Sequence, residues 1–197
     1  MGFPKVMRTF LRQDPDVMMV GEMRDPESLA IGIQAGLTGH LVLSTLHTNN
    51  SIETFGRMLD MGAESYLVAG VTVAILAQRL VRLNCSKCRE PYTPTVDERD
   101  ILKLTDAEIA ESKISKGRGC AECKGTGYKG RIGVFELIMG TPELRAAIAR
   151  NADFPTMQEV ARRQGYRTML EDGKSKVFQG WTTPDEVVKA VYTQSME

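Results

Sequence analysis

The sequence has no excess of charge of either sign. It contains 25 Lys and Arg residues against 25 Asp and Glu residues, so its formal net charge is zero at pH 7. No overall electrostatic field therefore favours nucleic acid or an anionic membrane, and such a partner would have to bind a local patch. A basic stripe interleaved with aromatic residues is also lacking, so a nucleic-acid-binding zinc module is only a minor alternative. We expect no nucleic-acid partner.

The sequence also lacks an apolar run long enough to span a membrane. Its longest run, residues 66–77, falls far short of the roughly 20 residues that cross a bilayer. We interpret this run as part of a buried helix over about residues 64–80. The N-terminus has no basic segment that leads into an apolar stretch and a small-residue cleavage site, so a secretory signal is unsupported. A cytoplasmic location is the default expectation.

What the sequence does contain is an alternation of strand and helix patterns. With 42% apolar residues, its 197 residues can bury one substantial core or two modest ones. Continuous apolar runs at residues 17–20 and 41–46 are typical of strands covered on both faces in a largely parallel sheet. Asp25 followed by Pro26 predicts an N-cap and the first turn of a helix. The helices predicted in this part cover about residues 3–11, 26–36, 50–62 and 64–80. Such an alternation predicts an α/β architecture.

The composition changes after residue 83, which divides the chain into three predicted domains. Residues 1–83 form a partial α/β domain, residues 84–138 a small four-cysteine subdomain, and residues 139–197 a helical C-terminal subdomain. The elements predicted beyond residue 83 are a helical stretch over residues 97–112, a strand or hairpin over 128–138, a helix opening at Thr141-Pro142, a helix over 154–164, and a helix that follows a capping-box pattern at residues 183–186.

All four cysteines occur in Cys-x-x-Cys pairs, Cys85 with Cys88 and Cys120 with Cys123. Two such pairs supply the tetrahedral sulfur set that suits Zn²⁺, and a site with four protein ligands has no open position, so the predicted zinc is structural. Basic residues close in sequence, Lys87, Arg89, Arg118 and Lys124, would offset the charge of the thiolates. Two disulfides or a redox pair are the alternatives, and residues 120–127 also resemble a single knuckle of the DnaJ chaperone zinc domain.

An acidic residue and the only two histidines follow or flank the predicted strands. Glu22 comes after the strand at 17–20, where P-loop ATPases place a carboxylate beside Mg²⁺ and the attacking water. Taken alone, such a glutamate is more often a solvated loop residue. His40 and His47 flank the strand at 41–46 and would point to opposite faces of a regular strand, so joint metal binding is not expected. A histidine at a strand end is more often a packing or hydrogen-bonding residue.

Taken together, these segments resemble the ATPases of type II secretion and type IV pilus assembly. RQDPDVMMVGEMRD at residues 12–25 is similar to their Walker B segment, and TGHLVLSTLHTN at residues 38–49 is similar to their His box. The resemblance continues through AQRLVR at 77–82, GTGYKGRIGVFE at 125–136 and RRQG at 162–165. It therefore covers nearly the whole chain, in order.

This resemblance implies a role for each matching residue. Glu22 would be the general base for the attacking water, and His47 would approach the terminal phosphate of ATP. Arg24 and Asp25 would support that site, with His40 and Thr48 also near the nucleotide. The fold implied is the C-terminal half of a RecA-like P-loop ATPase domain, followed by the zinc subdomain and a helical tail.

The resemblance also implies cofactors, partners and a setting. The complete enzyme would use ATP and Mg²⁺, with Zn²⁺ in the cysteine module, and would work as a homo-hexamer at the cytoplasmic face of the inner membrane on a platform protein. The cysteine module matches the extension and secretion branch and not the pilus-retraction branch.

One departure from the family pattern affects activity. No Gly-x-x-x-x-Gly-Lys-Ser/Thr loop occurs in the 197 residues, so Met1 is expected to begin partway through the family pattern. Phosphate binding needs that lysine and the loop amides, and we expect no ATP turnover by these residues alone. The alternative is a non-enzymatic zinc module that docks on an inner-membrane platform protein.

Overall fold

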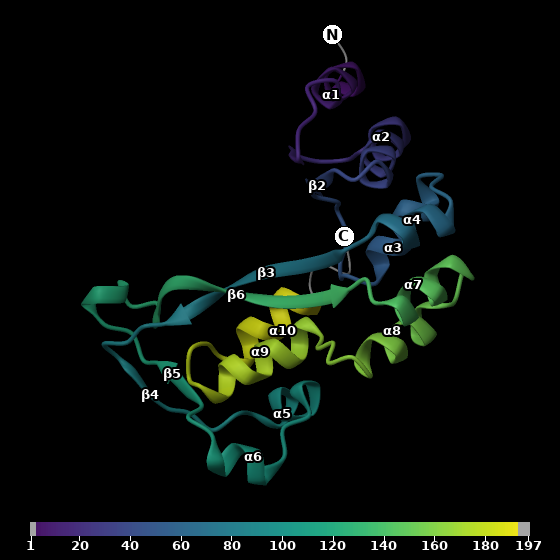
Figure 1. The fold of residues 1–197 in the computed structure, drawn as a ribbon. Coiled ribbons are helices and arrows are strands. Elements are labelled where there is room, and N and C mark those ends of the chain that lie inside the picture. Colours follow the sequence, from purple (N-terminus) through teal and green to yellow (C-terminus); the bar gives the residue numbers. More distant parts are fainter. Residues whose placement is uncertain (1–2, 193–197) are drawn as a thin grey trace. The chain divides into compact units, whose positions relative to one another are not determined.

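The computed structural model describes residues 3–192 and has a mixed α/β fold (Figure 1). Two compact units divide the chain. The first extends to Ile75 and includes Leu137–Tyr166, and the second comprises Leu76–Glu136 and the residues from Arg167 onward. Helices at residues 142–149 and 154–162 thus group with the N-terminal part, while the later helices group with the cysteine region. The division into three domains at residues 83 and 138 stays a prediction.

The first unit contains most of the predicted strand and helix alternation. Its elements are α1 (Phe3–Leu11), β1 (Val17–Val20), α2 (Pro26–Leu37), β2 (Leu41–Ser44), α3 (Glu53–Asp60), α4 (Ser65–Val71), α7 (Pro142–Ala149) and α8 (Phe154–Arg162). Asp25 is the N-cap of α2, and its carboxylate accepts a hydrogen bond from the Ser28 N–H at 2.8 Å. The predicted cap and start of this helix are therefore confirmed.

Strands β1 and β2 pair in parallel, with Val17 opposite Leu41 and Val20 opposite Ser44. Val20 and its neighbours on one face join the core of this unit, to which α2 contributes Leu29 and Ile33. The prediction that both faces are covered is wrong among the described residues, because Val17 and Leu41 lie on the other face and are about half exposed. The described helices cover only one face of this two-stranded sheet. The continuous apolar runs are typical of strands that are buried on both faces.

The predicted helix over residues 64–80 is also wrong in its second half. Helix α4 ends at Val71, and β3 (Ala74–Asn84) follows as a strand. Ala77 and Val81 are buried while Leu76 and Leu80 are at least half exposed. Two buried residues four apart fit the helical period and the strand period equally well, so the apolar pattern could not separate the two. Among the described residues no helix combines the length and apolarity needed to cross a membrane.

The second unit contains the cysteines and the last two helices. Its elements are β4 (Arg89–Pro91), α5 (Val96–Leu102), α6 (Asp106–Glu111), β5 (Ser115–Gly117), the 3₁₀ turn η1 (Ala121–Cys123), α9 (Met169–Phe178) and α10 (Pro184–Tyr192). Strand β3 pairs with β6 (Tyr128–Met139), and the two strands contribute residues to both units. The predicted strand at 128–138 is confirmed.

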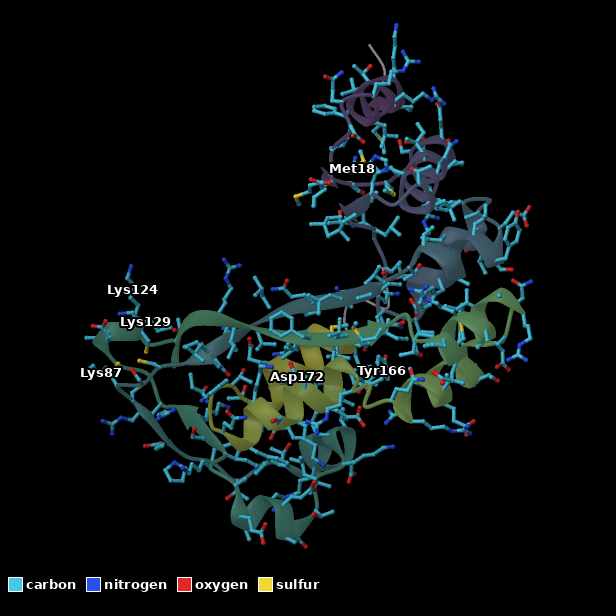
Figure 2. The ribbon with its side chains drawn as sticks, viewed as in Figure 1. Met18, Lys87, Lys124, Lys129, Tyr166 and Asp172 are labelled. Carbon is cyan, nitrogen blue, oxygen red and sulfur yellow. The ribbon has the colours of Figure 1, made fainter. Side chains whose placement is uncertain are left out.

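Helices α9 and α10 pack closely beside β6 (Figure 1). A Cβ built at Gly173 of α9 would lie only 2.4 Å from a methyl of Val187 on α10, so the glycine permits the close approach. Asp172, labelled in Figure 2, accepts a hydrogen bond from the Phe135 N–H of β6 at 2.8 Å. The second unit therefore has its own small core, formed by Leu102, Leu104, Ile114, Val177 and Val187.

One helical stretch in this unit differs from its prediction, and one predicted capping box is only half formed. The helical stretch at 97–112 is two helices, because Lys103 adopts a left-handed conformation and Thr105 starts a new capping box. At the start of α10 the Thr183 hydroxyl accepts from the Glu186 N–H at 3.4 Å, as in a capping box. The Glu186 carboxylate, however, accepts from the backbone and guanidinium of Arg82 at 3.0 and 2.5 Å. The sequence pattern of a capping box therefore did not indicate that the Glu186 side chain contacts β3.

Candidate catalytic pocket and metal centre

A pocket of about 440 Å³ in the first unit lies where the chain leaves β1 and β2. The two segments that follow these strands are joined by hydrogen bonds. The Thr45 hydroxyl donates to the Gly21 carbonyl at 2.8 Å, and the Met23 N–H donates to the Thr45 carbonyl at 3.2 Å. Parallel strands end at the same edge of a sheet, so these bonds bring together residues distant in sequence. The pocket is lined by Glu22, Met23, Arg24, Leu46, His47 and Arg57.

Glu22 is the centre of the polar contacts in this pocket. Its Oε2 lies 2.5 Å from Nη2 of Arg24, and its Oε1 lies 2.7 Å from Nε2 of His47. The hydrogen bond from Arg24 is the main reason that the pKa of the Glu22 carboxyl is lowered, although desolvation opposes it. The carboxylate is therefore ionised at neutral pH, as a general base must be.

Both carboxylate oxygens of Glu22 are thus occupied by other side chains. The Glu22 side chain is 18% exposed, while those of Arg24 and His47 are 77% and 87% exposed. The two partners lie on the open side of the pocket, so they can move without disturbing the core. Each oxygen keeps a further lone pair, so the carboxylate can still accept a hydrogen bond from water beside Arg24 and His47.

The structure gives the other predicted site residues different surroundings. The Asp25 carboxylate caps α2 through the Ser28 N–H and hydroxyl, and these bonds lower its pKa. His40 lies before β2, with Nδ1 3.1 Å from the Ala35 carbonyl. The Thr48 hydroxyl lies 2.8 Å from that of Thr54 on α3.

The six predicted residues therefore fall into two groups. Glu22, Arg24 and His47 meet at one carboxylate, and the contacts of Asp25, His40 and Thr48 are with other residues. Strand β2 ends at Ser44, so the strand does not stay regular up to His47 as the comparison of the two histidines assumed. Their roles toward a nucleotide stay predictions.

Arg57 is a pocket residue that the sequence analysis did not find. It lies on the solvent side of α3, whose Phe55 and Met58 are buried. An exposed arginine on an amphipathic helix is ordinary, so its type and spacing carry no functional signal. Arg57 differs from other exposed arginines only because the fold places α3 beside Glu22.

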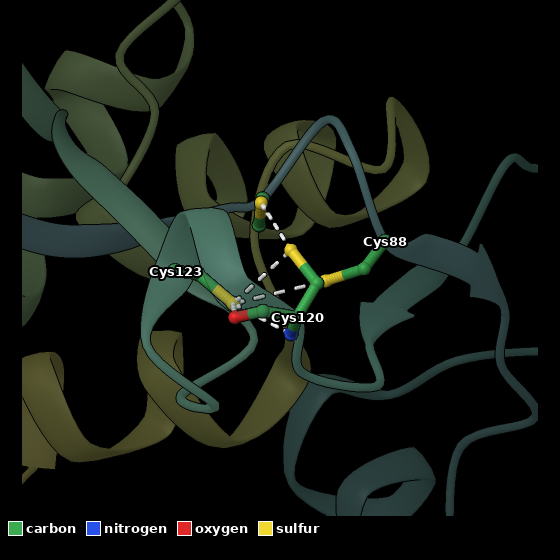
Figure 3. Close-up of side chains that lie close together, drawn as sticks. Cys88, Cys120 and Cys123 are labelled. Carbon is green, nitrogen blue, oxygen red and sulfur yellow. Dashed lines mark hydrogen bonds between the residues drawn. The ribbon is translucent and has the colours of Figure 1, made fainter.

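The second candidate site is the cysteine cluster of the second unit (Figure 3). All four cysteines are free, which does not support the disulfide alternative. The sulfur–sulfur distance is 3.9 Å for Cys85 and Cys120, 3.9 Å for Cys88 and Cys123, and 3.8 Å for Cys120 and Cys123. Tetrahedral Zn²⁺ with Zn–S distances of about 2.3 Å requires sulfur separations of about 3.8 Å. The four residues therefore fit a zinc ion, for which they would be the complete ligand set.

The backbone around the cysteines is shaped by close contacts between two glycines. Gly117, at the end of β5, lies against Gly127, so that a Cβ on Gly117 would be 2.0 Å from the Gly127 carbonyl oxygen. The Gly127 carbonyl in turn accepts from the Cys85 N–H at 2.9 Å. Strands β4 and β5 pair antiparallel, with Arg89 opposite Gly117. These contacts hold the two Cys-x-x-Cys turns next to each other.

Backbone amides prepare one of the thiols for a metal. Burial opposes ionisation of Cys123, but the N–H groups of Cys120 and Gly127, each 3.2 Å from its sulfur, help to lower its pKa to about 6. Burial raises the pKa of Cys88 to about 12, so zinc would have to displace its proton. Lys87, Lys124 and Lys129 mark the same end of this unit in Figure 2, and Lys129 forms an ion pair with Glu122 of η1.

Comparisons with known proteins agree with this arrangement. A family model described as "Type II/IV secretion system protein" matches residues 1–189. The chain is 44% identical over 186 residues to the type IV pilus assembly ATPase PilB of Thermus thermophilus, covering 94% of this chain and 21% of that protein. It is 44% identical over 189 residues to the type II secretion system protein E of Pseudomonas aeruginosa, covering 96% and 37%. The chain thus spans well under half of the length of these relatives.

Solved structures share the fold. The crystal structure of the pilus retraction motor PilT with bound ADP has a TM-score of 0.67 at 24% identity, covering all of this chain and 45% of that one. The structure of the Legionella pneumophila ATPase DotB has a TM-score of 0.63 at 23% identity, covering 94% and 41%. These similarities confirm the predicted fold class, a mixed α/β fold shared with the ATPases PilT and DotB, and the four-cysteine cluster is the candidate zinc site that the sequence predicts.

Proposed function

The chain belongs to the type II/IV secretion system protein family, and from this premise we propose that it forms the C-terminal part of a hexameric motor ATPase. The complete protein would couple ATP hydrolysis to the assembly of a type II secretion pseudopilus or a type IV pilus. Relatives of both kinds match the chain at 44% identity, so its sequence favours neither. Its partner would be a platform protein of the inner membrane, on the cytoplasmic side.

The observation that carries this proposal is the carboxylate of Glu22, set at the end of a parallel strand. Glu22 would orient and deprotonate the water that attacks the terminal phosphate of ATP, which the complete protein binds with Mg²⁺. Arg24 would leave the carboxylate for the phosphate, because its guanidinium attracts the phosphoryl oxygens more strongly as charge builds on them. His47 would turn with it and donate a hydrogen bond to the same oxygens. Once Arg24 and His47 had turned to the phosphate, more of the Glu22 carboxylate would be open to the attacking water.

Zinc has a structural role in this proposal. Cys85, Cys88, Cys120 and Cys123 would hold one Zn²⁺ with no open coordination position, so the ion would bind no substrate. Its contribution would be to fix the two Cys-x-x-Cys turns and the β4–β5 pair that joins them.

We also propose that the 197 residues alone do not hydrolyse ATP. They contain no Gly-x-x-x-x-Gly-Lys-Ser/Thr loop, whose lysine and backbone amides would hold the phosphates. That absence favours the second candidate function for this chain by itself, a zinc-containing module that docks on a platform protein without hydrolysis. An ATPase assay on this chain and on the complete protein tests the assignment. Turnover by the complete protein alone is expected, and a complete protein that lacks turnover would refute the motor function.

A further inference from the structure

The pocket beside Glu22 contains more positive charge than its own side chains neutralise. Arg24 and His47 share the carboxylate of Glu22. Arg57 lines the same pocket from α3, and its guanidinium makes no ion pair or hydrogen bond with any residue of the described range 3–192. One carboxylate thus faces two guanidinium groups and an imidazole. The pocket is therefore suited to receive an anion.

The unpaired state of Arg57 is not caused by a lack of acidic neighbours. Glu53 and Asp60 lie four residues before and three residues after it on α3, both at the spacing of helical ion pairs. The Glu53 carboxylate instead accepts from the Asn50 side chain at 2.7 Å. Asp60 forms no ion pair with Arg57 in the part of the chain that the structure describes. The Arg57 guanidinium is therefore available to bind a ligand in the pocket.

Helix α3 is fixed to the segment that bears His47, so the position of Arg57 is defined. The Thr54 hydroxyl, one turn before Arg57, lies 2.8 Å from that of Thr48, the residue after His47. Phe55 is fully buried in the core of the first unit. The ring of Phe154 lies against Gly56, where a Cβ would come within 2.7 Å of it. The backbone segments that bear Arg57 and His47 are therefore joined by a hydrogen bond and anchored to the core of the first unit.

We propose that Arg57 binds the phosphoryl anion that enters the pocket beside Glu22, and so is a further nucleotide-binding residue. The inference rests on the proposed function and names a ligand contact of that same site. A guanidinium presents N–H groups in a planar fork that fits two phosphoryl oxygens. Arg24 is paired with Glu22, whereas the Arg57 guanidinium has no such partner among residues 3–192 and can bind the anion without breaking an ion pair.

The test uses the complete protein with Arg57→Gln, Arg57→Lys and, as a matched control, Arg150→Gln. Arg150 is an exposed arginine of the same unit that does not line the pocket. Binding of AMPPNP and of ADP is measured by calorimetry, next to thermal melting and the kcat and KM for ATP. Losing a charged hydrogen bond to the terminal phosphate should weaken AMPPNP binding by Arg57→Gln roughly tenfold or more, and ADP binding less than about twofold.

The other variants sharpen the result. Arg57→Lys keeps the positive charge but loses the planar pair of N–H donors. Its AMPPNP affinity should therefore lie between those of wild type and Arg57→Gln. Arg150→Gln should match wild type, and melting should be unchanged in all variants. Equal affinity of wild type and Arg57→Gln for AMPPNP, an equal loss for both nucleotides, or a lysine variant no better than glutamine would overturn the proposal. A wild-type protein without ATP turnover would instead refute the proposed function, so the two failures are distinguishable.

Discussion

Nε2 of His47 lies 2.7 Å from Oε1 of Glu22, and this contact links the segment after β1 to the segment after β2. The contact pairs an exposed imidazole with a mostly covered carboxylate. His47 therefore has little packing to lose, and its effect should appear in turnover and not in stability.

His47→Ala in the complete protein should change the free energy of unfolding by less than about 1 kcal/mol, as expected at an exposed position. It should lower ATP turnover at least roughly tenfold, because the proposed phosphate contact would be lost. His40→Ala is the control, since His40 contacts the Ala35 carbonyl and should mainly affect stability. Melting curves and ATPase rates measure both. A His47 variant that melts early but hydrolyses ATP normally once folded would end its assignment as a phosphate sensor.

The cysteine cluster should bind one zinc ion per chain, measured by elemental analysis. Structural zinc sites contribute on the order of 10 kcal/mol, so Cys120→Ser or a chelator should unfold residues 85–130 before the rest. Ala121→Ser is a matched control, because it places a hydroxyl on the same turn at an exposed position that is not a ligand. Hydrogen exchange follows each segment. Unchanged protection of residues 85–130 in a metal-free sample would contradict the structural role of zinc.

The Arg82–Glu186 pair should make stability depend on pH. Burial opposes ionisation of Glu186, but Arg82 outweighs it and holds the pKa of Glu186 below its ordinary value of about 4.5. A lowered pKa in the folded state stabilises the fold above the unfolded value, and this contribution is lost as the pH falls below about 4.5.

Glu186→Gln should therefore cost roughly 1.5–3 kcal/mol near neutral pH and progressively less on acidification. Urea unfolding of wild type and variant between about pH 6 and pH 3 measures the difference, in which acid release of zinc is common to both. Glu159→Gln, at an exposed ion pair with Arg163, is the control and should show almost no effect. A constant difference between Glu186→Gln and wild type at every pH would contradict the assignment.

Local patterns in the sequence were sufficient to predict several parts of this structure. The Asp25 cap, the apolar run of β1 and the Cys-x-x-Cys spacing each depend on residues close together in the chain, so a short window contains the cause. Glu22 and His47 were found as a pair through a family resemblance and not through geometry. The structure adds that their side chains lie within hydrogen-bonding distance of each other.

Long-range contacts decided what the sequence could not predict. Residues 74–80 form a strand because β6 pairs with them, although their apolar spacing also fits a helix. Glu186 binds Arg82, which is 104 residues away, in place of completing the capping box. The role proposed for Arg57 depends only on the position of α3 beside Glu22. Tertiary pairing overrode local pattern in each case.

The most direct measurement of the central claim is ATP binding and hydrolysis by Glu22→Gln in the complete protein. Gln keeps the size and polarity of the side chain but cannot act as a general base. The account predicts ATP affinity within about threefold of wild type and a kcat lowered roughly a hundredfold or more. Hydrolysis by Glu22→Gln at the wild-type rate would contradict it, because the carboxylate that centres the pocket would then have no part in catalysis.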